Sequence, residues 1–155
     1  MSKLLKNRKG SGCIYVTGNT SVPSNVAVSG RIILNYNSVR IDIQGFTLEA
    51  TVGDAIQCSY NDKCISLRYL IATGETSSYN GLSATASPTV YINSSTISNK
   101  KYGVVAYQLS GVWSYNNIGT NNATGIRASA SVVMKSGSQP GGTTAESTDS
   151  GGVIR

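Results

Sequence analysis

Acidic side chains are the first candidates for chemistry in this chain, because glycoside hydrolysis generally needs two carboxylates about 5 to 10 Å apart on one wall of a cleft. The sequence has seven acidic residues and no histidine, so serine–histidine chemistry is excluded. Asp54 with Asp62, and Glu49 with Glu75, are the pairs that a loop could bring together. Neither pair recurs in the sequence repeat described below. We therefore predict no catalytic pair and keep Asp54 and Asp62 only as candidates.

Asp42 and Arg68 form the one cluster that would suit a polysaccharide lyase, which needs acids to hold a cation and a basic residue to take a proton. We expect instead that they form an exposed ion pair between successive repeats, worth roughly 0 to 1 kcal/mol. The cysteines, Cys13, Cys58 and Cys64, are odd in number and lack a zinc-type spacing. With no histidine, we predict no metal site and no cofactor. We interpret the cysteines as reduced, although Cys58 and Cys64 could pair.

Aromatic side chains make a better case for binding. Tyr91 and Trp113 lie 22 residues apart and Tyr115 lies beside Trp113, while Tyr102 and Tyr107 are expected on the next face. Rigid aromatic faces suit the apolar sides of sugar rings and also suit protein contacts. These five residues are the predicted ligand-binding set. Packing against sister chains in a trimer and plain stacking on the surface are the alternatives.

The aromatic residues belong to an internal repeat. Val90–Asn93 recurs as residues 112–115, and residues 102–106 recur as residues 124–128, both at a spacing of 22 residues. Periods of 20 to 50 residues are typical of solenoids, and short β-branched runs broken by Gly and Asn favour a β-solenoid. Only 13% of the residues are charged, which also argues against helices. The sequence predicts an all-β fold, a parallel β-helix of about five rungs.

Alternation along the repeat sorts its side chains into inward and outward columns, because neighbouring residues in a strand face opposite ways. We align residues 39–43 and 65–68 with the clear copies, so that Val39 and Ile41 share the inward columns of Ile65 and Leu67. The outward columns then contain Arg40, Ser66, Tyr91, Trp113 and Lys135 in one, and Asp42, Arg68, Asn93 and Tyr115 in the other.

The second strand of each repeat is predicted to open at a glycine and to carry small inward residues. The glycines are Gly53, Gly81, Gly103 and Gly125, and one inward column contains Ile56, Ala84, Ala106 and Ala128. This alignment turns Asp54 inward, where an unpaired carboxylate would be costly. We therefore expect either a shift of register there or hydrogen bonds from turn amides to Asp54.

Four segments are predicted along the chain. They are a basic flexible leader or attachment arm at 1–12, an irregular N-terminal cap at 13–38, the rungs at 39–135 and a C-terminal strap or tail at 136–155. The formal net charge of +6 comes largely from the leader, which contains Lys3, Lys6, Arg8 and Lys9. The rest of the chain is close to neutral, so we do not expect a nucleic-acid partner.

No run of residues is apolar for long enough to cross a membrane, and the first nine residues lack the apolar core of a secretory signal. We therefore expect no membrane insertion and no export through a signal peptide.

The rung pattern resembles a known family. Three features carry the resemblance: a glycine followed by Val or Ile and, after one intervening residue, by Ala; turns bearing Asn and Ser; and the glycine-rich residues 137–155. These features are similar to the right-handed, pectin-lyase-like parallel β-helix of phage tailspikes and neck appendages, including those of Bacillus phages and prophages. The likeness covers about residues 39–155. It implies a homotrimer on the virion, made in the host cytoplasm and joined to other virion proteins through the N-terminal segment.

The resemblance also implies a role in adsorbing to bacterial surface polysaccharide or degrading it. This chain has too few rungs for the long substrate groove of a full tailspike. We therefore predict a structural and host-surface adhesion module that binds an envelope glycan or protein. A polysaccharide-degrading hydrolase or lyase is the alternative.

Overall fold

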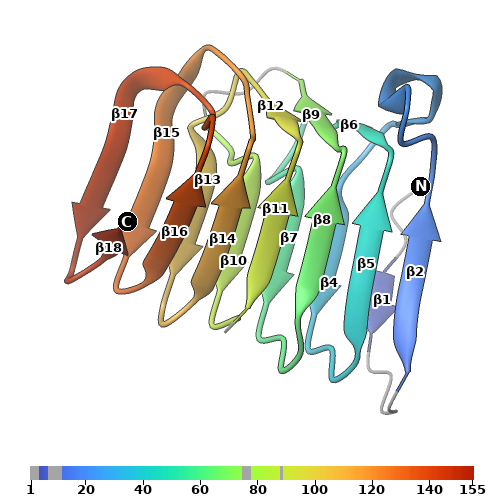
Figure 1. The fold of residues 1–155 in the computed structure, drawn as a ribbon, viewed down its shortest axis with the longest axis horizontal. Coiled ribbons are helices and arrows are strands. Elements are labelled where there is room, and N and C mark those ends of the chain that lie inside the picture. Colours follow the sequence, from blue (N-terminus) through green and yellow to red (C-terminus); the bar gives the residue numbers. More distant parts are fainter. Residues whose placement is uncertain (1–3, 7–11, 75–77, 88) are drawn as a thin grey trace.

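The computed structural model describes residues 4–6, 12–74, 78–87 and 89–155. Within these residues the chain forms parallel strands that stack as a solenoid of about six turns, with one short 3₁₀ helix, η1 (Pro23–Asn25). Figure 1 shows the strands of one sheet rising on the near side while the chain returns on the far side, each turn lying further to the left. This is a right-handed coil. The predicted parallel β-helix is confirmed.

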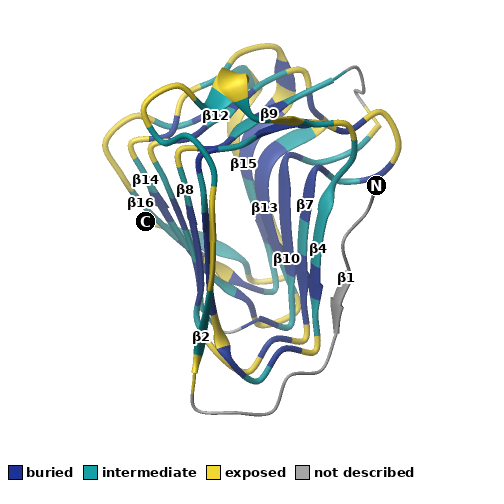
Figure 2. Cartoon of the chain, turned by 90° about the vertical axis from the view of Figure 1, so that its right-hand side faces the viewer, coloured by how far each residue is buried: buried dark blue, intermediate teal, exposed yellow. Residues whose placement is uncertain are grey.

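Three parallel sheets form the walls of the solenoid (Figure 2). Sheet A contains β1 (Leu4–Lys6), β4 (Ile32–Asn35), β7 (Ile56–Ser59), β10 (Leu82–Thr85), β13 (Tyr102–Tyr107), β15 (Asn122–Ser129) and β17 (Gly142–Asp149). Sheet B contains β2 (Cys13–Thr17), β5 (Arg40–Gln44), β8 (Ile65–Arg68), β11 (Val90–Asn93), β14 (Gly111–Tyr115), β16 (Val132–Ser136) and β18 (Val153–Ile154). The short sheet C contains β3 (Ala27–Val28), β6 (Thr47–Glu49), β9 (Ile71–Thr73) and β12 (Thr96–Ile97).

The core consists of aliphatic columns that run along the solenoid axis. In sheet B one column contains Ile41, Ile65, Val90, Val112 and Val133, all of them buried. The expected narrow interior of sheet A is confirmed, because Cys58, Ala84, Ala106 and Ala128 lie in one buried column. Each large aliphatic side chain contributes roughly 1.5 to 3 kcal/mol through its burial.

The predicted register of the earliest rung is wrong by two residues. Ile41 and Ile43 of β5, not Val39 and Ile41, pair with Ile65 and Leu67 of β8. A slip of one residue would turn the apolar side chains outward, but a slip of two keeps every side chain on its face. Alternation therefore cannot detect this error.

The outward columns of sheet B change accordingly. The observed columns contain Tyr15, Asp42, Ser66, Tyr91, Trp113 and Met134 in one, and Thr17, Gln44, Arg68, Asn93, Tyr115 and Ser136 in the other. Arg40 therefore lies beside Cys64 rather than Ser66. Lys135 pairs with the buried Ser114 instead of extending the Trp113 column.

Asp54 follows both expectations made for it. Ile56 pairs with Leu82, which shifts the predicted alignment by two residues and removes Gly53 from the glycine column. Asp54 then lies in the turn before β7, and its Oδ1 accepts a hydrogen bond of 2.8 Å from the backbone N–H of Asn80.

The corner between sheets A and B holds the coils together with polar groups. Residues with positive φ turn the chain there, among them Tyr36 and Tyr60. Inside this corner, buried Asn61 accepts a 2.8 Å hydrogen bond from the Nδ2 of Asn37 and donates to the Oγ of Ser87. Such a ladder satisfies buried polar groups that would otherwise be costly.

The regular coils extend beyond the predicted rungs in both directions. Residues 13–38, predicted as an irregular cap, contribute β2, β3 and β4, which pair with β5, β6 and β7. Residues 136–155 contribute β17 and β18, so this segment is ordered rather than a tail. Of the predicted leader, residues 4–6 form β1, which pairs with β4; apart from Gly12, the remainder lies outside the described residues.

Polar side chains occupy inward positions in the coil nearest the C-terminus. Glu146 pairs with Ile126 of the preceding coil, and its Oε1 lies 3.0 Å from the Nζ of Lys135. Ile154 continues the apolar column through Val133. No helix among the described residues could span a membrane.

Candidate functional site

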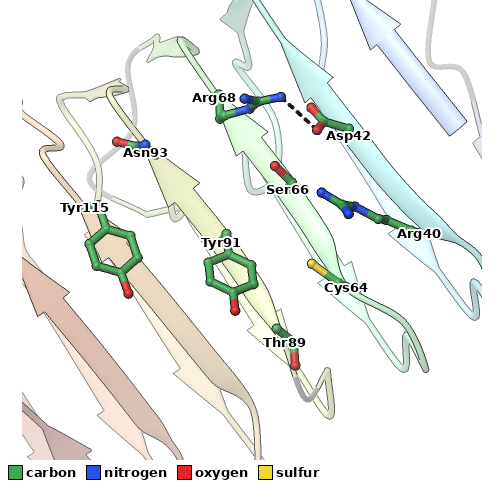
Figure 3. Close-up of a pocket in the computed structure, with 9 residues that line it drawn as sticks. All are labelled: Arg40, Asp42, Cys64, Ser66, Arg68, Thr89, Tyr91, Asn93 and Tyr115. Atoms are coloured by element: carbon green, nitrogen blue, oxygen red, sulfur yellow. Dashed lines mark hydrogen bonds and ion pairs between the residues drawn. The ribbon is translucent and has the colours of Figure 1, made fainter. Parts of the chain in front are cut away.

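A depression of about 550 Å³ lies on the outer face of sheet B, centred on β8 (Figure 3). Strands β5, β8, β11 and β14 supply most of its lining. The lining residues are Arg40, Asp42, Cys64, Ser66, Arg68, Thr89, Tyr91, Asn93 and Tyr115.

The depression exists because one coil carries small side chains where its neighbours carry large ones. Cys64 and Ser66 project from β8 and its preceding residue, and they form the floor. The coil on one side presents Arg40, and the coil on the other presents Tyr91. Since parallel strands lie about 4.8 Å apart, the missing bulk leaves a hollow about one coil wide.

Asp42 and Arg68 make the predicted ion pair, but the carboxylate is buried rather than exposed. The Nη2 of Arg68 lies 2.8 Å from the Oδ2 of Asp42, with 40% and 4% of the respective side chains exposed. The pair runs diagonally, because Asp42 is directly opposite Ser66. Oδ1 of Asp42 and Nε of Arg68 are buried without a hydrogen-bond partner in the described structure. The pair is therefore coupled more tightly than an exposed pair, and each partner retains unused bonding capacity.

Arg40 is the unneutralised cation of the depression. Its side chain is exposed and reaches from β5 toward Ser66 (Figure 3). Arg40 takes part in none of the three ion pairs found among the described residues. With Asp42 paired to Arg68, the depression carries a net positive charge.

The surroundings of Cys64 disfavour the thiolate that a nucleophile requires at neutral pH. Burial raises the pKa of its thiol, with Arg40 acting in the opposite direction. A thiol is a weak nucleophile until it ionises. Cys58 faces the interior, and all three cysteines are free, as predicted. No group of metal-ligating side chains occurs in the described part of the chain.

The aromatic wall contains three of the five predicted ligand-binding residues. Tyr91 and Tyr115 line the depression, and Figure 3 shows their rings broadside to a viewer looking onto sheet B. Trp113 lies in the coil after Tyr91, and their ring centroids are 5.7 Å apart with an interplanar angle of 22°. The wall is therefore a pair of stacked rings with Tyr115 beside it.

Tyr102 and Tyr107 lie elsewhere, on β13 of sheet A. The Tyr102 hydroxyl accepts a 2.9 Å hydrogen bond from the Nη1 of Arg127, whose guanidinium lies 5.0 Å from the ring centroid. Arg127 also pairs with Asp149. Burial raises the pKa of Tyr107. The structure thus divides the predicted set between two sheets.

The candidate catalytic acids are not brought together. Asp54 lies before β7 and Asp62 follows it, so the strand separates them. Neither lines the depression, where Asp42 is the sole carboxylate among the described residues. Glu49 ends β6, whereas Glu75 lies outside the described residues.

Arg40, Cys64 and Thr89 were not identified as site residues from the sequence. The relevant signal in the sequence is the length of the aliphatic run that precedes Gln44, because a longer run can pair with the next strand in more than one register. The run from Val39 to Ile43 admits two registers that keep aliphatic residues inside, and only the second brings Arg40 beside Cys64.

Comparison of this chain with protein-family models, with curated proteins and with solved structures found no match.

Proposed function

We propose that this chain is a structural and adhesion module of a phage tail or appendage that binds a glycan or protein of the bacterial envelope through the outer face of sheet B. The aromatic wall of the depression carries the proposal, because Tyr91, Trp113 and Tyr115 are held at fixed spacing by paired strands. Rigid rings bury contact area at little entropic cost. The resemblance of the rung pattern to phage tailspikes and neck appendages supports the virion location.

Binding without cleavage is better supported than depolymerisation. Hydrolysis would need a second carboxylate near Asp42, and none of the other described acids lines the depression. Asp42 itself is held by Arg68. A lyase would need free acids to hold a cation, and Asp42 offers a single unpaired oxygen, Oδ1.

We further propose that the module acts as a homotrimer, joined to other virion proteins through its N-terminal segment. Three weak sites on one rod raise the avidity through their effective concentration. Light scattering of the intact chain tests this proposal. A mass of three chains supports it, and a monomer at micromolar concentration contradicts it.

The adhesion proposal is tested by retention of the fluorescently labelled chain on isolated bacterial cell walls, beginning with those of Bacillus. Tyr91→Ala and Tyr115→Ala should each reduce retention by about tenfold, the loss of one well-packed aromatic contact. Tyr36→Ala and Tyr60→Ala are matched controls, because these two exposed rings stack on each other at the corner between sheets A and B, 5.1 Å apart. Equal loss in both groups, or in neither, would argue against sheet B as the binding face.

A further inference from the structure

The charged side of the depression is not explained by adhesion through aromatic rings alone. Arg40 is exposed and free of ion pairs within the described structure. Asp42 is more than nine-tenths buried beside it and keeps Oδ1 without a hydrogen-bond partner. A cation without a counter-ion and a buried acceptor without a donor lie against the same small-residue floor.

We propose that the depression over β8 binds a single sugar ring that carries an anionic group, a carboxylate or a phosphate. This inference rests on the proposed adhesion function and names the ligand class for it. The apolar side of the ring packs on Tyr91, and its anionic group meets Arg40. A ring hydroxyl donates to Asp42, the acceptor that the protein leaves unpaired.

The size of the hollow matches one ring. The coil of β8 has Ser66 in the column where the next two coils have Tyr91 and Trp113. Two coils span about 9.6 Å from β5 to β11, at about 4.8 Å per strand, which leaves room for one sugar ring between the side chains of the flanking coils. Extra rings of the same glycan would lie beyond Ser66, toward Tyr115 of β14.

The charges of the hollow select an anionic ring over a neutral one. Arg68 is occupied by Asp42, so the net charge that a ligand meets is that of Arg40. Guanidinium groups bind carboxylate and phosphate with two parallel hydrogen bonds. The interaction is near the surface, so affinity should fall as ionic strength rises.

The chain contains its own reporter for this binding. Trp113 is the single tryptophan, and it stacks on the ring that forms the wall. A ligand that packs on Tyr91 changes the surroundings of Trp113, so its fluorescence can be titrated without a label. The probes are a tetrasaccharide of alternating glucuronate and N-acetylglucosamine, the same compound with methyl-esterified carboxylates, and N-acetylglucosamine 6-phosphate.

The acidic tetrasaccharide should bind about tenfold more tightly than its neutral ester, the effect of one charge-assisted contact near the surface. Arg40→Gln should reduce this preference to less than about twofold. Lys101→Gln removes one exposed cation next to sheet A and should leave the preference intact. Tighter binding of the sugar phosphate than of the acidic tetrasaccharide, with the same dependence on Arg40, would assign the anionic group to phosphate rather than carboxylate.

Filling the hollow gives an independent test. Ser66→Tyr places a ring in the column of Tyr91 and Trp113 and should abolish binding, while the circular dichroism spectrum is unchanged. Ser83→Tyr makes the same change on the outer face of sheet A and should have no effect on binding. If Ser66→Tyr unfolds the chain, the effect of Arg40→Gln on the preference for the acidic tetrasaccharide still tests the proposal.

Several outcomes would overturn the inference while leaving adhesion in place. One is equal affinity for the acid and its ester, independent of Arg40. Another is that no probe changes the fluorescence of Trp113, although the chain is still retained on cell walls in a manner that depends on Tyr91. A glycerol phosphate polymer, which has no ring, that binds as tightly and ignores Tyr91→Ala would overturn the role of the ring. If every sheet B variant is still retained on cell walls as well as the natural chain, the proposed function itself would be contradicted.

Discussion

The buried thiol of Cys58 makes the stability of this protein sensitive to alkaline pH. Burial raises the pKa of Cys58 from 9.0 to about 12. A folded-state pKa above the unfolded value means that the folded chain holds a proton which the unfolded chain releases, so this contribution to stability is complete below pH 9 and is lost as the pH rises toward 12. At about 1.4 kcal/mol per pKa unit, the loss is about 2 kcal/mol at pH 10.5 and about 4 kcal/mol at its limit.

Cys58→Ala is the variant that isolates this effect. Alanine already occupies the same inward column in the next coil, at Ala84, so the backbone accommodates it. The substitution should cost about 1 kcal/mol at pH 7.5, similar to the removal of one methyl group from a core. At pH 10.5 the cost of losing the thiol volume remains, but the ionisation penalty disappears, so the variant should equal or exceed the natural chain in stability.

Urea unfolding of both chains at pH 7.5 and pH 10.5 measures the difference. Other groups titrate in this range: burial raises the pKa of Tyr107 and lowers that of Lys100, with opposite effects on stability. These contributions are common to both chains and cancel in the comparison. A pH dependence that is the same in the natural chain and in Cys58→Ala would refute the reasoning.

Three further predictions concern the groups that hold the coils together. A double-mutant cycle with Asp42→Asn and Arg68→Gln should give a coupling of about 1 to 2 kcal/mol in urea unfolding, because the carboxylate is buried; a coupling near zero would show the pair to be solvated. Asn61→Ala should destabilise by about 2 to 3 kcal/mol by leaving the Leu34 carbonyl and Asn37 amide unpaired, and Asn61→Ser, the residue of the next coil, should cost less. The Nζ of Lys100 donates to the carbonyls of Ala50, Thr73 and Gly74, so Lys100→Met should lower the free energy of unfolding by about 2 to 4 kcal/mol; an unchanged or raised midpoint would mean that the cost of burying the ammonium equals or exceeds the value of these bonds.

The fold was predictable because each coil of a solenoid repeats the same sequence pattern at a regular spacing. Val90 and Val112 recur at the period that the paired strands later show, and the aliphatic columns follow from alternation. The irregular coils were harder. Ile14 of β2 belongs to the same inward column as Ile41, but the coil between them is longer than the clear repeat. A variable loop removes the fixed offset on which an alignment depends.

Buried Lys100 shows a different limit of the sequence. Lysine is seldom fully buried, and nothing in its sequence position signals that its ammonium lies among three carbonyls. Asn122 occupies the comparable position one coil later, where its Oδ1 accepts a hydrogen bond from the backbone N–H of Lys100. Its shorter side chain donates to the backbone carbonyls of Ile97 and Gly141. The presence of a lysine in one coil where the next coil has an asparagine can be understood only when the positions of the neighbouring backbone carbonyls are known.

The candidate site was predictable in its aromatic half and not in its charged half, and the reason lies in how a repeat is recognised. A repeat is defined by what successive coils share, so it identifies Tyr91 and Trp113 as neighbours. A depression arises where one coil differs from the next, and Ser66 creates the hollow because it does not continue the aromatic column. Binding chemistry on a solenoid should therefore be sought at coils that depart from their column, where a ligand can take the place that the missing side chain leaves.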